Sequence, residues 1–246
     1  MPNFYKSIFF LFILISQTSC AERVQPEPTY TKITPELITI NTDQFSPHKL
    51  TYKKLGNEMN YVVSKTRNSN HEFWKVEIYF GSDLSSKPDT IWLDNESFAF
   101  RRRLLSMPDY TIDVSMNDQL FSGELTPTEN STYTLSTYNK IYPHDAFEPA
   151  IINYAIAALP LKLGYSASIP VFDLNNGSDI FWSNIKVMAE ETITIDKIPY
   201  DCWKVESDGI RNKTIWISKQ HLFAVKMKTS GNAGAWEVVP SSITFN

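Results

Sequence analysis

Apolar and polar residues alternate with a period of two along most of the chain. In residues 74–80, every second residue is apolar, from Trp74 to Phe80, while Lys75 and Glu77 occupy positions in between. Successive side chains of a β-strand point to opposite faces, so this pattern predicts strands with one buried face. In the first half of the chain we expect such strands at residues 60–66, 74–80, 90–93, 97–105, 110–116, 119–123 and 132–138.

The second half continues the pattern as a meander. Asp208-Gly209 is a dipeptide typical of two-residue β-hairpins, and it predicts a tight turn between its flanking strands. Strands that follow one another through short turns are antiparallel. In this half we expect strands at residues 166–174, 180–195, 200–206, 211–217, 222–229, 235–239 and 242–245.

One segment between the two sets of strands has helical spacing. Its apolar residues recur at steps of four and form one stripe, which should face the concave side of the sheet. We expect a mostly apolar helix at about residues 147–159, ended by Pro160. The stripe consists of Phe147, Ile151, Ala155 and Leu159.

The start of this helix has two alternatives. Asp145 and Glu148 have the spacing of a capping box, or Glu148 is the N-cap and Pro149 takes the first helical position. The predicted fold is mainly β: a curved antiparallel meander sheet, an open or half barrel, with one apolar helix packed on it. We expect it to form a single domain over residues 49–246.

The first 19 residues resemble an export signal. Lys6 precedes an unbroken apolar run at residues 8–15, and small or polar residues follow it at 16–19. A transmembrane helix needs about 20 apolar residues, so this run is too short to span a bilayer. Cys20, which directly follows residues 16–19, resembles the lipid-attachment residue of bacterial lipoproteins. The alternative is an ordinary secretory signal, cut near Ser19 or Ala21.

Residues 20–48 contain four prolines among Glu, Gln, Thr and Ser, which is typical of an extended tether. We therefore expect a lipid-anchored tether that ends near Lys49. The residue after Cys20 is Ala21, not Asp, and by similarity to enterobacterial lipoproteins this favours the outer membrane, facing the periplasm. The membrane is thus an expected partner, reached through the lipid anchor.

The composition excludes several classes of protein. Of the 246 residues, 42% are hydrophobic and 20% charged, which excludes a disordered chain. The formal net charge of −4 and the lack of a basic stripe argue against nucleic-acid binding. In a strand, Arg101 and Arg103 of the one basic run would share a face and Arg102 would take the other; we expect these arginines on a solvated edge.

Candidate chemistry is sparse. If Cys20 is acylated, Cys202 has no intrachain partner, and it lies in an alternating strand without a histidine nearby in sequence, so we expect a buried structural side chain. The four histidines are too widely spaced for a local metal site. No catalytic, nucleotide-binding or metal motif occurs. We therefore assign no catalytic, cofactor, metal or ligand-binding residue and expect no cofactor and no enzyme activity.

Several segments resemble a known bacterial family, the domain-of-unknown-function family DUF3108. The resemblance covers about residues 58–239. The segments that carry it are residues 89–98, residues 159–164, Val187 with residues 190–193, residues 198–205, and residues 215–218 with residues 225–226, in that order. More distantly, the chain resembles the half-barrel fold of lipoprotein-localisation carriers. The resemblance implies a curved antiparallel sheet wrapped around a helix at the cell envelope, and it implies no known activity.

These observations predict a cell-envelope lipoprotein with a non-catalytic binding or structural role. The alternative is a carrier or chaperone of a lipid or other apolar ligand, and an envelope hydrolase is a further alternative. An apolar small ligand or an envelope protein is the expected partner. We expect the helix to fill the core, which would leave the working surface outside the sheet.

Overall fold

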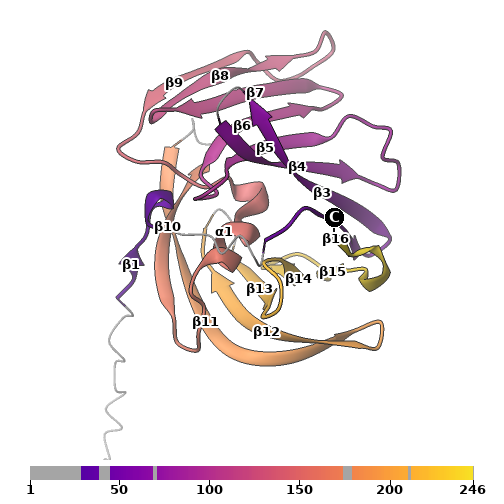
Figure 1. Cartoon of the computed structure of the whole chain (residues 1–246). Helices are drawn as coiled ribbons and strands as arrows, with labels where there is room; N and C mark the ends of the chain where they lie inside the picture. The colour runs from indigo at the N-terminus through magenta and orange to yellow at the C-terminus, as the bar shows by residue number, and fades with distance from the viewer. Residues whose placement is uncertain (1–28, 39–44, 69–70, 174–178, 210–211, 246) are drawn as a thin grey trace, which may run out of the picture.

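The computed structural model describes residues 29–38, 45–68, 71–173, 179–209 and 212–245. Within these residues, sixteen strands form one sheet that curls around a single short helix (Figure 1). The expected mainly β fold, an open curved sheet with one helix packed on it, is confirmed. The predicted export signal, Cys20 and much of the predicted tether lie outside the described residues.

Most strands lie where the alternation predicts them. Their bounds are β1 (Thr31–Lys32), β2 (His48–Lys54), β3 (Asn57–Asn68), β4 (His71–Phe80), β5 (Asp89–Asp94), β6 (Phe100–Ser106), β7 (Tyr110–Asn117), β8 (Leu120–Pro127), β9 (Ser136–Ile141), β10 (Ser166–Asp173), β11 (Asp179–Ile195), β12 (Ile198–Ser207), β13 (Lys213–Ser218), β14 (Ala224–Thr229), β15 (Trp236–Val238) and β16 (Thr244–Phe245). The short 3-10 helices are η1 (Pro35–Leu37), η2 (Pro149–Ile151) and η4 (Pro240–Ser242).

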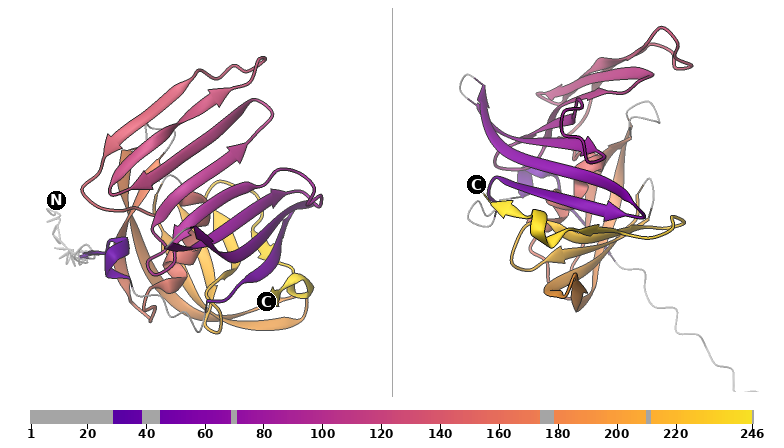
Figure 2. Two further views of the ribbon diagram at one scale, coloured as in Figure 1. Left: turned by 45° about the horizontal axis from the view of Figure 1, so that its top comes forward. Right: turned by 90° about the vertical axis from the view of Figure 1, so that its right-hand side faces the viewer.

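The strand order joins the two ends of the domain. The path runs β1-β10-β11-β12-β13-β14-β15-β2-β3-β4-β5-β6-β7-β8-β9, and β16 pairs with β2. All described pairs are antiparallel except β1 with β10. Figure 2 shows β14 and β15 beside β2 and β3, in agreement with the register Val238↔Tyr52. The Tyr52 hydroxyl also donates to the carbonyl of Ala224, 2.5 Å away.

The sheet does not close into a barrel, because β9 pairs neither with the edge strand β1 nor with β10. The chain between them crosses the gap on the inside. The amide of Phe100 donates to the carbonyl of Ala146 (3.0 Å), and the amide of Phe147 donates to the carbonyl of Pro170 (2.9 Å). Phe100 and Phe172 meet edge to face at 4.7 Å. The open seam is therefore filled by backbone and aromatic side chains.

The helix is shorter than predicted and is buried on every side. The predicted segment 147–159 contains η2 and then α1 (Ile152–Ala158). Glu148 is the N-cap, since its carboxylate accepts from the amide of Ala150, and Pro149 takes the first position of η2; this is the second of the two predicted starts. All four stripe residues are buried, as predicted. Tyr154 and Ile156, on other sides of α1, are also fully buried, so the helix plugs the curved sheet.

The folded body begins earlier than Lys49. β1 pairs with β10, and the ring of Phe45 is only 2% exposed. Phe45 packs edge to face against Trp74 at 4.5 Å and against Phe98 at 4.6 Å. Part of the segment assigned to the tether thus belongs to the core, because apolar residues between its prolines have partners that only the folded sheet brings near.

The tight hairpin predicted at Asp208-Gly209 is wrong. β12 ends at Ser207 and β13 begins at Lys213, so the connection is longer than two residues. The φ of Gly209 does not lie in the left-handed region. A two-residue turn of this kind instead joins β11 to β12, where Asp196 (φ 48°) and Lys197 (φ 69°) both adopt positive φ.

Candidate functional site

Cys202 is buried, as expected. Its side chain is 0% exposed, and its thiol donates weakly to the carbonyl of Tyr200, 3.4 Å away. Burial raises the pKa of the Cys202 thiol to about 12, with a smaller contribution from the carboxylate of Asp201. A nucleophilic cysteine needs a lowered pKa, and this thiol does not meet that requirement.

His48 and His221 both contact Phe223 and Phe245, whereas His71 and His144 lie beside other aromatic residues. His48 is buried and its Nε2 lies 3.1 Å from the hydroxyl of Tyr154, while its Nδ1 lies 2.7 Å from the carbonyl of Ser46. Burial lowers the pKa of His48. No group of three or more His, Cys, Asp or Glu side chains suited to a metal ion occurs among the described residues.

The expectation of a solvated arginine edge is wrong, because β6 lies between β5 and β7 in the middle of the sheet. Arg102 points outward and forms an exposed pair with Asp113. Arg103 points inward. A β-bulge where Trp92 pairs with Arg102 interrupts the alternation, so Arg101 lines an outer cavity together with Arg102 instead of sharing the face of Arg103.

Arg103 forms a buried ion network with two carboxylates. Its Nε and Nη2 donate to Asp89 at 3.0 and 2.7 Å, and its Nη1 donates to Glu148 at 2.7 Å. The side chains of Asp89 and Glu148 are 1% and 0% exposed. Burial raises the pKa of Glu148, although the charge of Arg103 acts in the opposite direction. The network fixes the start of the helix segment to β5 and β6.

An apolar recess opens beside this network, between η2 and the ends of β10–β13. Its volume is about 350 Å³. Ile152, Val171 and Phe181 form apolar walls, and Arg103 and Lys213 bring cationic groups to the lining. Helix residues line it, so the recess lies on the concave side of the sheet.

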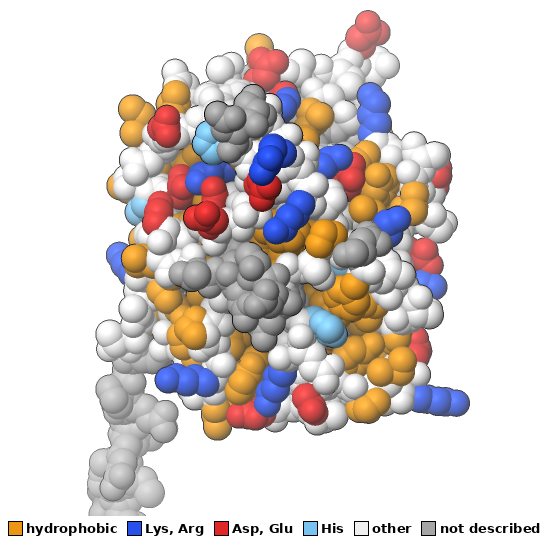
Figure 3. Space-filling view, in the orientation of Figure 1, with side chains coloured by type: hydrophobic (Ala, Val, Ile, Leu, Met, Phe, Trp, Pro, Cys, Tyr) orange, Lys and Arg blue, Asp and Glu red, His pale blue; other side chains and the backbone are white. Residues whose placement is uncertain are grey.

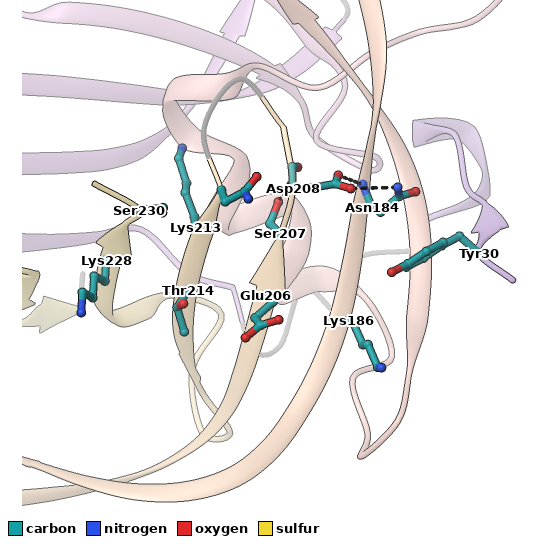
Figure 4. Close-up of a pocket in the computed structure, with 11 residues that line it drawn as sticks. Tyr30, Asn184, Lys186, Glu206, Ser207, Asp208, Lys213, Thr214, Lys228 and Ser230 are labelled. Atoms are coloured by element: carbon teal, nitrogen blue, oxygen red, sulfur yellow. Dashed lines mark hydrogen bonds between the residues drawn. The ribbon is translucent and has the colours of Figure 1, made fainter. Parts of the chain in front are cut away.

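A second cavity, of about 440 Å³, shares Ser207, Asp208 and Lys213 with the recess. It lies over the opposite face of β11–β14, because its strand residues alternate with the buried ones. Lys186 and Lys228 stand at opposite sides of the close-up view (Figure 4). The ammonium group of each makes no hydrogen bond or ion pair with the rest of the described chain.

Asp208 forms a fixed wall between the two cavities. Its carboxylate accepts from the amide of Asn184 (2.5 Å) and from Nδ2 of the same residue (2.9 Å) (Figure 4). The hydroxyl of Ser183 bonds to that of Ser207 at 3.0 Å on the side of the recess. The arrangement therefore places an apolar compartment next to a polar one that carries ammonium groups. We call the two cavities together the mouth.

Sequence reasoning assigned no residue of the mouth. Its lining comes from β6, the helix segment and β10–β14, which are far apart in sequence. Lys226 and Lys228 alternate with Val225 and Met227, so the sequence is consistent with a polar strand face at these two lysines. Which lysines stand beside an apolar recess depends on the strand order, and no local pattern carries that information.

In the part of the chain that the structure describes, fold and site define a mainly β protein: one open sheet encloses a single helix and carries a two-part mouth at the helix start. Residues 117–235 match the family model described as protein of unknown function (DUF3108), which confirms the resemblance to that family. The match includes α1 and β10–β14, and with them most of the mouth. No curated protein and no solved structure matches the chain, and the resemblance to the carrier half-barrel stays a prediction. Among the described residues, no helix is long and apolar enough to cross a membrane.

Proposed function

We propose that this protein is a lipid-anchored, non-catalytic binding module of the bacterial cell envelope, and that its mouth holds an amphiphile with an anionic head. The observation that carries the binding role is the pairing of the two cavities across Ser207, Asp208 and Lys213. An apolar tail would occupy the recess against Ile152 and Phe181. The anionic head would then lie toward the lysines of the outer cavity.

The anchor in this proposal is a diacylglycerol on Cys20, facing the periplasm from the outer membrane. Its support is the order of charged, apolar and polar residues in the first 20 positions. Tyr30, only ten residues after Cys20, lines the outer cavity. Ten extended residues span at most about 35 Å, so an anchored chain keeps the mouth close to its membrane.

The limited accessibility of the carboxylates near the recess supports a non-catalytic role. The carboxylates of Asp89 and Glu148 are enclosed by Arg103 and have almost no exposed surface. The carboxylate of Asp208, which lines the recess, already accepts two hydrogen bonds from Asn184. A general acid or base must reach the proton that it transfers. The surface in Figure 3 also carries acidic and basic side chains interspersed, which suits a small ligand better than a large polyanion.

The experiment uses anilinonaphthalenesulfonate, an apolar dye with one negative charge, and follows its fluorescence. We expect saturable binding that dodecanoate displaces better than dodecanol, because only dodecanoate carries the charge. Ile152→Trp should fill the recess and abolish binding. Lys186→Ala with Lys228→Ala should weaken it several-fold and reduce its salt dependence.

Lys49→Ala is the matched control, since Lys49 is exposed on β2 and lines neither cavity. Circular dichroism establishes that each variant is folded. Dye binding that survives Ile152→Trp in a folded protein contradicts the placement of the ligand. Equal displacement by dodecanoate and dodecanol contradicts the anionic head.

A further inference from the structure

A second pair of cavities lies on the outer face of β3–β7 and at the neighbouring strand ends. The mouth uses none of these strands apart from Arg103 on β6. One cavity, of about 520 Å³, is lined by Phe73 and Trp92 together with polar side chains. The next, of about 620 Å³, shares Phe73, Arg101 and Asn117 with the first. The shared residues make the two cavities neighbouring parts of one surface, which we call the trench.

The sheet register places strand residues of the first cavity on one face. Thr66 lies opposite Phe73, Trp92 lies opposite Arg102, and Arg102 lies opposite Ser115. Residues directly opposite in neighbouring strands point to the same side of the sheet. The two aromatic rings are half-buried, and neither packs against the core cluster. Both rings line the cavities and are partly exposed, and the guanidinium of Arg102 lies over one face of the Trp92 ring.

Polar side chains that could bond to a ligand lie in the same cavity as these rings. The side chains of Thr66, Ser115 and Asn117 form no hydrogen bond with any described residue, although each lines the trench. Arg102 is fixed by Nε and Nη2 donating to Asp113 at 3.0 and 2.8 Å, with its guanidinium carbon 5.4 Å from the centre of the Trp92 ring. A planar group of donors and acceptors thus lies next to an aromatic surface.

The charges of the trench select against an anionic ligand. Its lining contains the two guanidinium groups of Arg101 and Arg102. Against them stand the carboxylates of Glu36, Asp94, Asp113, Asp118 and Asp145. Arg101 is already bound to Asp94 and Asp145, at 3.4 and 2.8 Å. A phosphate or sulfate would meet more negative than positive charge.

We propose that the trench binds a neutral oligosaccharide. A sugar ring presents C–H groups that suit the negatively charged face of an aromatic ring. Its hydroxyls both donate and accept, which matches the unpaired hydroxyl and amide groups along the trench. Two adjoining cavities, each within the usual range of about 300–1,000 Å³ for small-ligand sites, suit a chain of sugars better than a single one.

The experiment titrates the full folded domain with the β-1,4-linked tetramer of N-acetylglucosamine by isothermal calorimetry. The monomer, a sulfated tetrasaccharide and tetralysine are titrated in parallel. We expect the neutral tetramer to bind at least ten-fold more tightly than the monomer and more tightly than the sulfated chain. Trp92→Ala should reduce the affinity at least ten-fold, and Asn117→Ala should reduce it several-fold.

Trp182→Ala is the matched control. Trp182 is also half-buried, also lies outside the core cluster, and also has a cation over its ring, Lys32 at 4.7 Å. The Trp182→Ala variant should bind the tetramer with the affinity of the parent protein. If Trp92→Ala does not fold, Asn117→Ala decides, because Asn117 makes no side-chain bond that the fold needs. The proposal is overturned if the tetramer does not bind, if folded variants bind like the parent, or if tetralysine alone binds.

Discussion

Three adjacent arginines of β6 have different environments, although their side chains are chemically identical. Arg102 and Asp113 are each 48% exposed, whereas Arg103 is 14% exposed and its partners are almost fully enclosed. An exposed ion pair contributes about 0.2–1 kcal/mol to stability. Removal of one member of a buried network leaves uncompensated charge and costs about 3–5 kcal/mol.

We therefore expect Arg103→Met to lower the free energy of unfolding by about 3–5 kcal/mol, because Asp89 and Glu148 would remain buried without a cation. Arg102→Met on the same strand should lower it by about 1 kcal/mol or less. Urea denaturation at neutral pH measures both losses. Similar losses for the two variants would show that the network does not hold the helix start.

His48 predicts a dependence of stability on pH. Burial lowers its pKa in the folded state, and the groups that face it are the Tyr154 hydroxyl, the Ser46 carbonyl and His221. Above the unfolded value of about 6.5 both states are neutral at this site. Below it the unfolded chain takes up a proton that the folded chain resists, so stability falls as the pH falls.

His48→Gln should flatten the fall in unfolding free energy between about pH 7 and pH 5.5, whatever its stability at pH 7. Urea denaturation at a series of pH values measures the slope. Burial also lowers the pKa of His221, so part of the dependence of the unfolding free energy on pH remains in this variant. His71→Gln, at an exposed position, should keep the slope of the parent. An unchanged slope in His48→Gln would assign the effect to other groups.

Two neighbouring residues of the helix segment lie in different environments, one in the core and one at the recess. Ile151 is 2% exposed and belongs to the stripe, whereas Ile152 is 6% exposed and forms a wall of the recess. We expect Ile151→Ala to cost about 2–5 kcal/mol, because it leaves a cavity in a filled core. Ile152→Ala should cost less, since it widens a space that is already open.

Thermal and urea denaturation of both variants test this difference. A small loss for Ile151→Ala, together with dye binding by the parent, would indicate a void beneath the helix. The carrier with an enclosed cavity would then become the better description. Tyr154→Phe is the control for Ile151→Ala, because it removes only the hydroxyl bonded to His48 and leaves the ring in the core.

At the level of elements, the sequence predicted more of the fold than of the sites. The strands and the helix stripe were predictable because burial on one face imposes a period of two or of about four. The turn at Asp208-Gly209 was not, since the dipeptide preference is weaker than the constraint from Asp208, whose carboxylate is bound to Asn184. Arg101 was misplaced because a β-bulge leaves no mark in the alternation.

The sites belong to the scale of the whole molecule. Arg103, Ile152, Phe181 and Lys213 come from four different elements, and only the strand order brings them to one recess. Phe73 and Trp92 each occupy an ordinary outward position in a strand. Their shared trench follows from the pairing of β3 to β7, which the alternation of single strands does not specify.

The proposed anchor also concerns the whole molecule. We expect Cys20→Ser to move the protein from the membrane fraction to the soluble fraction, because each buried methylene of an acyl chain contributes about 0.8 kcal/mol and the variant has none. Fractionation followed by immunoblotting measures this. Cys202→Ser should remain in the membrane fraction, since Cys202 is buried in β12. A membrane-bound Cys20→Ser variant would contradict the lipid anchor.

The pairing of β2 with β15 and β16 determines when the domain can finish folding. Pairings within the meander β2–β9 are local and form quickly. The other edge of β2 pairs with β15 and β16, which are far away in sequence. Synthesis from the N-terminus therefore leaves that edge unpaired until the last residues emerge. During this interval the unfinished chain exposes a strand edge to which a chaperone can bind, and native structure is completed only after the C-terminal strands arrive.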